Sequence, residues 1–121
     1  MSECYCDFSV EFYHSEMRTA RKKHRCGECG TTIAPGQRYQ HASGKCEGDI
    51  YDAKTCSLCL ALIEWVRAHV PCLCIEHGNA IECVFNAVDE YAYQAPGLRF
   101  GALRRLHAIN HEVRMVHGRA A

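Results

Sequence analysis

The second half of the chain carries apolar residues at helical spacing. Apolar side chains follow one helix face after residue 57, and Pro71 is expected to end that helix. A second apolar stripe lies within residues 79–93, and it consists of Ile81, Val84, Phe85, Val88, Tyr91 and Ala92. After a break at residues 95–97, a third stripe contains Leu98, Ala102, Leu106, Ile109, Val113 and Val116. The pattern therefore predicts three helices.

Shorter elements are expected in the first half. Pro35 and Gly36 are a turn signal, and residues 38–42 and 50–53 have the character of two short strands around a polar loop. Residues 4–17 mix aromatic and charged side chains without a clear period, so we expect an irregular arm or a short strand there. The first half is thus predicted to hold one small β-hairpin.

Cysteine is unusually frequent. Ten of the 121 residues are cysteines, about 8%, which constrains the whole of a short fold. Such a density indicates disulfides in an exported protein or metal sites in a reducing compartment. Residues 1–25 contain four acidic residues and a basic run, without the apolar core of a signal peptide. No uncharged stretch exceeds nine residues, against about 20 needed to cross a bilayer. These features favour a cytoplasmic, metal-binding protein without a membrane segment.

Two C-x2-C pairs are the strongest chemical feature. Cys26 pairs with Cys29 and Cys56 with Cys59, with 26 residues between the pairs. Zn²⁺ prefers four soft ligands in a tetrahedron, and each pair can supply two thiolates. Glycines beside the first pair let its turn fold tightly, and the second pair is expected where a helix begins. A site closed by four thiolates is structural and not catalytic. An iron–sulfur centre or four reduced core cysteines are the alternatives.

The order of knuckle, hairpin and helix start resembles treble-clef zinc fingers. The segment His24-x-Cys26-x2-Cys29-Gly-x2-Ile33-x2-Gly36-x2-Tyr39 resembles the opening of LIM-type and poly(ADP-ribose) polymerase-type fingers. Residues 17–70 are similar to a family of small, uncharacterised bacteriophage and prophage proteins, which share ARK-x-H-x-C-x2-C-G-x2-I-x2-G-x2-Y and a closing TC-x2-C. The similarity continues through VPCLCIEHGN and APGLRFG. This resemblance implies a zinc-binding protein of phage type in the bacterial cytoplasm, but no particular biochemical role.

The expected fold is α+β in a single domain of residues 1–121. Residues 1–23 are expected to form an N-terminal arm. Residues 24–70 are expected to form a treble-clef-like finger with its following helix, and residues 71–121 a helical part packed on the finger.

Two further cysteine pairs have C-x-C spacing. They are Cys4 with Cys6 and Cys72 with Cys74, and His77 follows three residues later. The predicted helix after the C-x2-C site leads the chain away from the first metal, so that these two pairs can meet at its far end. We therefore consider a second zinc ion held by these four cysteines, with His77 as a substitute ligand. Packing of free thiols in a small core is the alternative.

Charge is balanced overall but uneven locally. The chain has 14 basic and 14 acidic residues, so its net charge at pH 7 is zero and gives no bulk signal for nucleic acid. Basic residues cluster just before the first cysteine pair, namely Arg18, Arg21, Lys22, Lys23 and Arg25. Three arginines after the break at residues 95–97 are candidates to extend this patch, namely Arg99, Arg104 and Arg105.

Two functions remain open. The first is a non-enzymatic zinc protein that binds nucleic acid, or regulates, through the basic residues next to the finger. The second is an adaptor or inhibitor of a host bacterial machine, such as a defence or transcription complex; near-zero net charge and amphipathic helices fit it equally well. His107, Asn110 and His111 spell the letters of HNH nucleases, but that family takes them from a hairpin and a helix. We expect a solvated helix face there, no catalytic residues and no small-molecule substrate.

Overall fold

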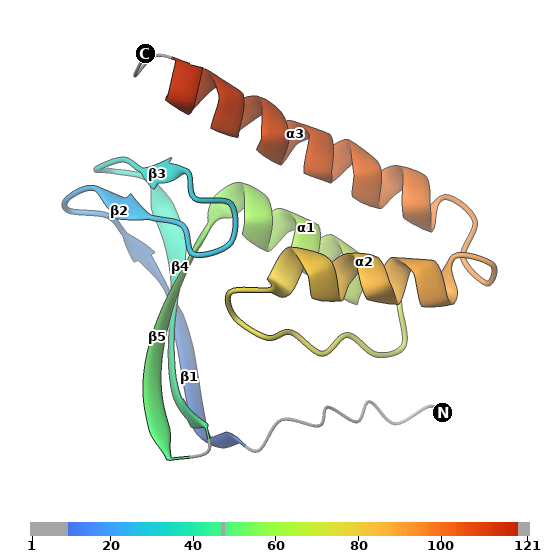
Figure 1. The fold of residues 1–121 in the computed structure, drawn as a ribbon, viewed down its shortest axis with the longest axis horizontal. Coiled ribbons are helices and arrows are strands. Elements are labelled where there is room, and N and C mark those ends of the chain that lie inside the picture. Colours follow the sequence, from blue (N-terminus) through green and yellow to red (C-terminus); the bar gives the residue numbers. More distant parts are fainter. Residues whose placement is uncertain (1–9, 47, 119–121) are drawn as a thin grey trace.

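The computed structural model describes residues 10–46 and 48–118, and the fold is α+β. Three strands, β1 (Val10–Thr19), β4 (Arg38–Cys46) and β5 (Asp49–Cys56), form an antiparallel sheet in the order β1-β4-β5. Between β1 and β4, the two-residue strands β2 (His24–Arg25) and β3 (Thr32–Ile33) form a separate antiparallel ribbon. Figure 1 shows this ribbon at one end of the twisted sheet.

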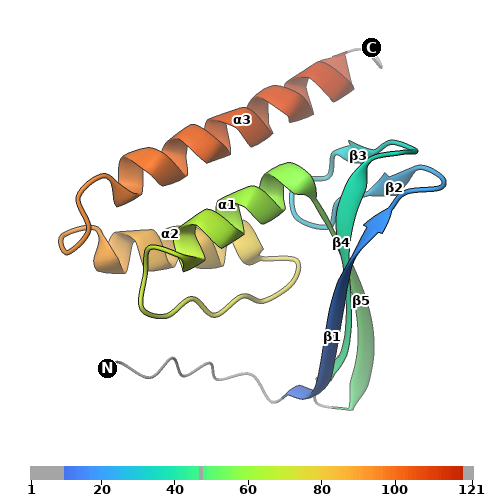
Figure 2. The ribbon, with the colours of Figure 1, turned by 180° about the vertical axis from the view of Figure 1, so that it is seen from behind.

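Three helices lie to one side of the sheet, as both views show (Figures 1 and 2). Helix α1 (Ser57–Arg67) follows β5 directly, and α2 (Ala80–Tyr91) and α3 (Leu98–Gly118) come after it. The apolar stripes predicted from the sequence correspond to these helices. No helix formed by the described residues is long and apolar enough to cross a membrane.

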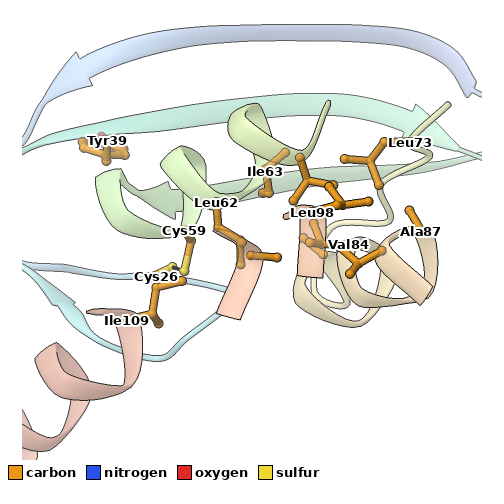
Figure 3. Packing of buried hydrophobic residues seen from close by; sticks show 14 of the residues in the cluster. Cys26, Tyr39, Cys59, Leu62, Ile63, Leu73, Val84, Ala87, Leu98 and Ile109 are labelled. Carbon is orange, nitrogen blue, oxygen red and sulfur yellow. Dashed lines mark hydrogen bonds between the residues drawn. The ribbon is translucent and has the colours of Figure 1, made fainter. Parts of the chain in front are cut away.

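The core lies where the three helices meet. Leu62 of α1, Val84 of α2 and Leu98 of α3 are almost fully buried and belong to one cluster of side chains (Figure 3). Ala102 and Ile109 continue the buried face of α3, as the sequence pattern predicted. Burial of a leucine or valine side chain contributes about 1.5–3 kcal/mol. This cluster therefore stabilises the packing of α2 and α3 on α1.

Gly101 lets α1 and α3 approach each other closely. A Cβ atom at this position would lie 2.2 Å from Cη2 and 2.4 Å from Cζ2 of Trp65. The indole ring also contacts the guanidinium of Arg105, whose Cζ lies 4.2 Å from the ring centroid, and it stacks on His69 at 4.2 Å between centroids. Trp65 therefore lies between His69, just after α1, and Arg105 of α3, over a glycine that leaves room for its ring.

The sheet is larger than the sequence pattern predicted. The segment expected as an irregular arm or short strand forms β1 from Val10 onward, and residues 1–9 lie outside the described part of the chain. All side chains from Tyr13 to Thr19 are exposed, so this strand has no alternation of buried and exposed positions. Backbone pairing with β4 holds it instead. A strand of this kind leaves little hydrophobic signal in the sequence.

Candidate metal centre and basic pocket

The first cysteine pair lies on a tight turn, which we call the knuckle (residues 26–30), between β2 and β3. The backbone amide of Cys26 donates to the carbonyl of Thr31 at 2.9 Å, and the amide of Gly30 donates to the carbonyl of Cys26 at 3.0 Å. Gly30 has φ +76°, a left-handed conformation that glycine adopts without steric cost. The turn thus brings Cys29 back towards Cys26.

The second pair lies at the junction of β5 and α1. Cys56 is the N-cap residue of α1 with an extended backbone (φ −68°, ψ 163°), and Cys59 follows in the first turn of the helix. The amide of Gly27 donates to the carbonyl of Lys54 at 2.8 Å. This bond joins the knuckle to the end of β5, so the two pairs are held face to face.

The four thiols form a compact group, which we call the cysteine cluster (Cys26, Cys29, Cys56 and Cys59). Their Sγ atoms all lie within 4.8 Å of one another, with 3.9 Å between Cys26 and Cys59 and 3.7 Å between Cys29 and Cys56. Cys26 and Cys59 are fully buried and belong to the same hydrophobic cluster as Ile109 of α3 (Figure 3). The cluster therefore has the donor set and spacing to hold one metal ion inside the core.

Local polar groups act on the charge of these sulfurs. The backbone amides of Glu28 and Cys56 each donate to Sγ of Cys26 at 3.4 Å, which favours a thiolate there. Hydrogen bonding with Cys29, Cys56 and Cys59 lowers the pKa of Cys26. Hydrogen bonding within the cluster, above all with Cys26, raises the pKa of Cys59. Without a cation the thiols thus share protons, whereas four thiolates together require a bound positive charge.

Glu28, inside the knuckle, contacts the second half of the chain. Its Oε1 accepts a hydrogen bond from the amide of Gly78 at 2.6 Å, and its Oε2 accepts one from the amide of Ala80 at 2.8 Å. Ala80 is the first residue of α2, so the carboxylate caps that helix. This contact could not be predicted from local sequence patterns, because the two amides lie about fifty residues away from Glu28.

The proposed second site is described only in part. Cys4 and Cys6 lie outside the described residues. Cys72 and Cys74 are disulfide-bonded, and not to each other, since their Sγ atoms are 3.9 Å apart. Zinc binding by these two cysteines would therefore require that their disulfides be reduced, because the thiolate is the metal ligand. Nε2 of His77 lies 3.2 Å from the hydroxyl of Tyr13. Across residues 10–46 and 48–118, the cysteine cluster is the one group of side chains with metal-ligand geometry. The second metal ion stays a prediction.

The three residues of α3 that match the letters of HNH nucleases lie on the surface of the protein. His107, Asn110 and His111 are all exposed, and they are not part of the metal-binding group found among the described residues.

The basic segment before the knuckle borders a hollow, which we call the basic pocket. It has a volume of about 780 Å³ and is lined by Arg18, Thr19, Arg21, Lys22, His24 and Tyr39. Arg18 of β1 lies opposite Tyr39 of β4 in the sheet register, and the ring centroids of His24 and Tyr39 are 5.1 Å apart. Three of the five basic residues predicted from the sequence therefore line one pocket.

The later arginines do not extend this pocket. The Arg99 guanidinium pairs with Asp89 at 3.0 Å, Arg105 covers the indole of Trp65, and Arg104 is exposed on α3. Arg99 is in the first turn of α3, and both views place the start of α3 at the end of the molecule opposite to β2 and β3 (Figures 1 and 2). The expected single basic patch is thus divided, because α3 begins far from the knuckle.

Comparison of the chain with protein-family models, with curated proteins and with solved structures finds no match. The cysteine cluster and the basic pocket are therefore the features from which a function can be inferred.

Proposed function

We propose that this protein is a structural-zinc module that binds nucleic acid through its basic pocket. The observation that carries the proposal is the position of the pocket directly beside the cysteine cluster. His24 lines the pocket and belongs to β2, which leads into Cys26 after one further residue. A metal ion that fixes the knuckle would therefore fix one wall of the pocket.

Zinc is the metal that the cluster fits best. Four thiolates at a Zn–S distance of about 2.3 Å in a tetrahedron have sulfurs separated by about 3.8 Å. The distances of 3.9 Å and 3.7 Å within the cluster agree with this value. A four-thiolate shell leaves no open position for a substrate or a reactive water, so the ion has a structural and not a catalytic role.

The order of elements supports a treble-clef type of finger. A knuckle between β2 and β3, the β4–β5 hairpin and helix α1 follow one another, and the second cysteine pair lies at the start of the helix. The proposal of a phage-type zinc protein of the host cytoplasm rests separately on the resemblance of residues 17–70 to phage and prophage proteins.

The charge of the pocket supports a phosphate partner. Arg18 is paired with Glu16 at 2.6 Å, whereas no carboxylate among the described residues forms an ion pair with Arg21, Lys22 or Lys23. These three side chains are exposed. Exposed cations without an intramolecular partner are available to neutralise phosphates, with release of the counterions that surround a nucleic acid.

The test is binding of the zinc-loaded protein to DNA and RNA over a series of salt concentrations. We expect binding at roughly 50 mM salt that weakens steeply towards 200 mM. Replacement of Lys22 and Lys23 by alanine should weaken binding and reduce the salt dependence, with zinc content unchanged. No binding of either nucleic acid at roughly 50 mM salt would exclude the proposal.

A protein partner is the second candidate, and one observation favours it. Three large apolar side chains are exposed around the α2–α3 connection, namely Tyr93 (79%), Phe100 (70%) and Leu103 (47%). Aromatic side chains of this kind are frequent at the centre of protein interfaces. Capture of a bacterial protein that is lost in the Phe100→Ser variant and kept in Lys22→Ala would support this candidate over the first.

A further inference from the structure

The basic pocket combines two kinds of side chain that fit different parts of one ligand. Arg21 and Lys22 bring positive charge to its rim, and His24 and Tyr39 bring aromatic rings to its wall. A nucleotide likewise consists of an anionic phosphate and a flat, aromatic base. The pocket volume, about 780 Å³, lies within the range of small-molecule sites, roughly 300–1,000 Å³.

The aromatic wall is supported from behind. Tyr39 is only 4% exposed, and its ring lies against His24 with a centroid distance of 5.1 Å and an interplanar angle of 42°. Tyr39 therefore fixes the His24 ring, which is half-buried. An aromatic ring in a fixed position is a suitable surface on which a base can stack.

The basic rim is also held in place. Ala20 is buried; its amide donates to the carbonyl of Gln37 at 2.8 Å, and its carbonyl accepts from the amide of Gly36 at 2.8 Å. These two bonds fix the chain just before Arg21, and the knuckle fixes it just after Arg25. Because the segment is anchored at both ends, ligand binding has little backbone freedom to remove.

We propose that the basic pocket receives one unpaired nucleotide of a single-stranded nucleic acid, with the phosphate at Arg21 and Lys22 and the base against His24. This inference rests on the proposed nucleic-acid function, and it adds that the bound nucleic acid is single-stranded. In a duplex the bases are paired and stacked, so that a base reaches a pocket only after it is extruded from the helix at a cost in free energy. In a single strand the bases are free to stack on aromatic side chains.

The test compares one oligonucleotide as a single strand and as a duplex, with the zinc-loaded full chain at roughly 50 mM salt. We expect the single strand to bind about ten-fold tighter or more. The His24→Ala variant should lose about five-fold or more of its affinity for the single strand, as for other stacked bases, and keep its duplex affinity. His24→Phe, which retains a ring, should restore single-strand binding.

Lys22→Ala and Lys23→Ala form a matched pair of controls. Lys22 lines the pocket and Lys23 does not, although both are exposed lysines and adjacent in the chain. Lys22→Ala should weaken single-strand binding more than Lys23→Ala does. Zinc content is measured for each variant, so that a loss of folding is recognised.

A measurement on the unmodified protein keeps the inference testable if the His24 variants do not fold. In NMR spectra, the ring protons of His24 should shift upfield when a single-stranded oligonucleotide is added. Inorganic phosphate or an acidic peptide should not cause this ring-current shift. Its absence with the bound oligonucleotide would overturn the proposal.

The two proposals fail in distinguishable ways. Equal affinity for the single strand and the duplex would overturn the unpaired-nucleotide inference and leave nucleic-acid binding intact. Failure to bind either form would overturn both. Binding of an acidic peptide at the pocket with no binding of nucleic acid would assign the pocket to a protein partner and overturn both as well.

Discussion

The carboxylate of Glu28 lies 2.8 Å from the backbone amide of Ala80, and it connects the knuckle to the first turn of α2. A second bond, from the amide of Gly78 at 2.6 Å, uses the other carboxylate oxygen. Negative charge at a helix N-terminus is favourable because unpaired amides and the helix dipole both point towards it. The residue between two predicted metal ligands therefore caps a helix that belongs to the other half of the chain.

Loss of this contact is expected to reduce stability without loss of the metal. Glu28→Ala should lower the free energy of unfolding by about 0.5–2 kcal/mol, the range found for removal of helix caps. Glu28→Gln, which keeps one acceptor oxygen, should cost less. Urea unfolding of the zinc-loaded protein is the measurement. Glu90→Ala, on an exposed position of the same helix, should change stability by less than about 0.5 kcal/mol. Equal effects of Glu28→Ala and Glu90→Ala would contradict the capping role.

Removal of one ligand is expected to abolish the metal site. Cys59→Ser should lose zinc and most of the cooperative fold, because metal binding and folding are coupled at structural sites. Cys83→Ser is the matched control, since Cys83 is a free thiol on α2 outside the cluster. Elemental analysis and circular dichroism measure the two effects. Retention of one zinc per chain in Cys59→Ser would contradict the ligand assignment.

A methyl group at Gly101 is expected to be harmful. In Gly101→Ala the new Cβ would lie 2.2 Å from the rigid ring of Trp65, so α1 and α3 must move apart. Overpacking of this kind costs about 1–3 kcal/mol, and the melting temperature should fall accordingly. In the background of Trp65→Leu the same change should cost much less. Additive effects of the two substitutions would show that the ring and the glycine do not interact.

Stability is expected to fall on mild acidification, in part through His77. Burial is the largest cause that lowers the pKa of His77 below 6.5, so the unfolded chain binds a proton at a higher pH than the folded one. The stability that the neutral imidazole of His77 contributes to the folded state is therefore fully present above pH 6.5. It is lost as the pH falls towards the lower pKa of His77 in the folded chain. His77→Gln should flatten this part of the profile, measured by urea unfolding with zinc content monitored. His107→Gln, on the exposed face of α3, should leave the profile unchanged. An identical profile for His77→Gln and the unmodified chain would contradict this account.

Sequence patterns predicted those features of the molecule that depend on residues close together in the chain. The spacing of the cysteine pairs predicted a cluster, because a C-x2-C turn brings two sulfurs together wherever it occurs. The apolar stripes predicted the helices, because Val84, Val88 and Ile109 must face a common core.

Contacts between distant segments were not predictable in this way. Strand β1 depends on backbone pairing with β4 and has no buried face along Tyr13–Thr19. The cap by Glu28 depends on where α2 packs, and the separation of Arg99 from the basic pocket depends on where α3 begins. Each of these relationships is set by the assembled fold and not by neighbouring residues.

The position of the cysteine cluster along the chain has a consequence for biosynthesis. The four cysteines of the cluster all precede residue 60, whereas α2 and α3 occupy residues 80–118. Because the chain is made from its N-terminus, the full ligand set emerges from the ribosome before either of these helices does. Metal capture can thus come first, and α2 and α3 can then dock on a nucleus in which Glu28 is already placed.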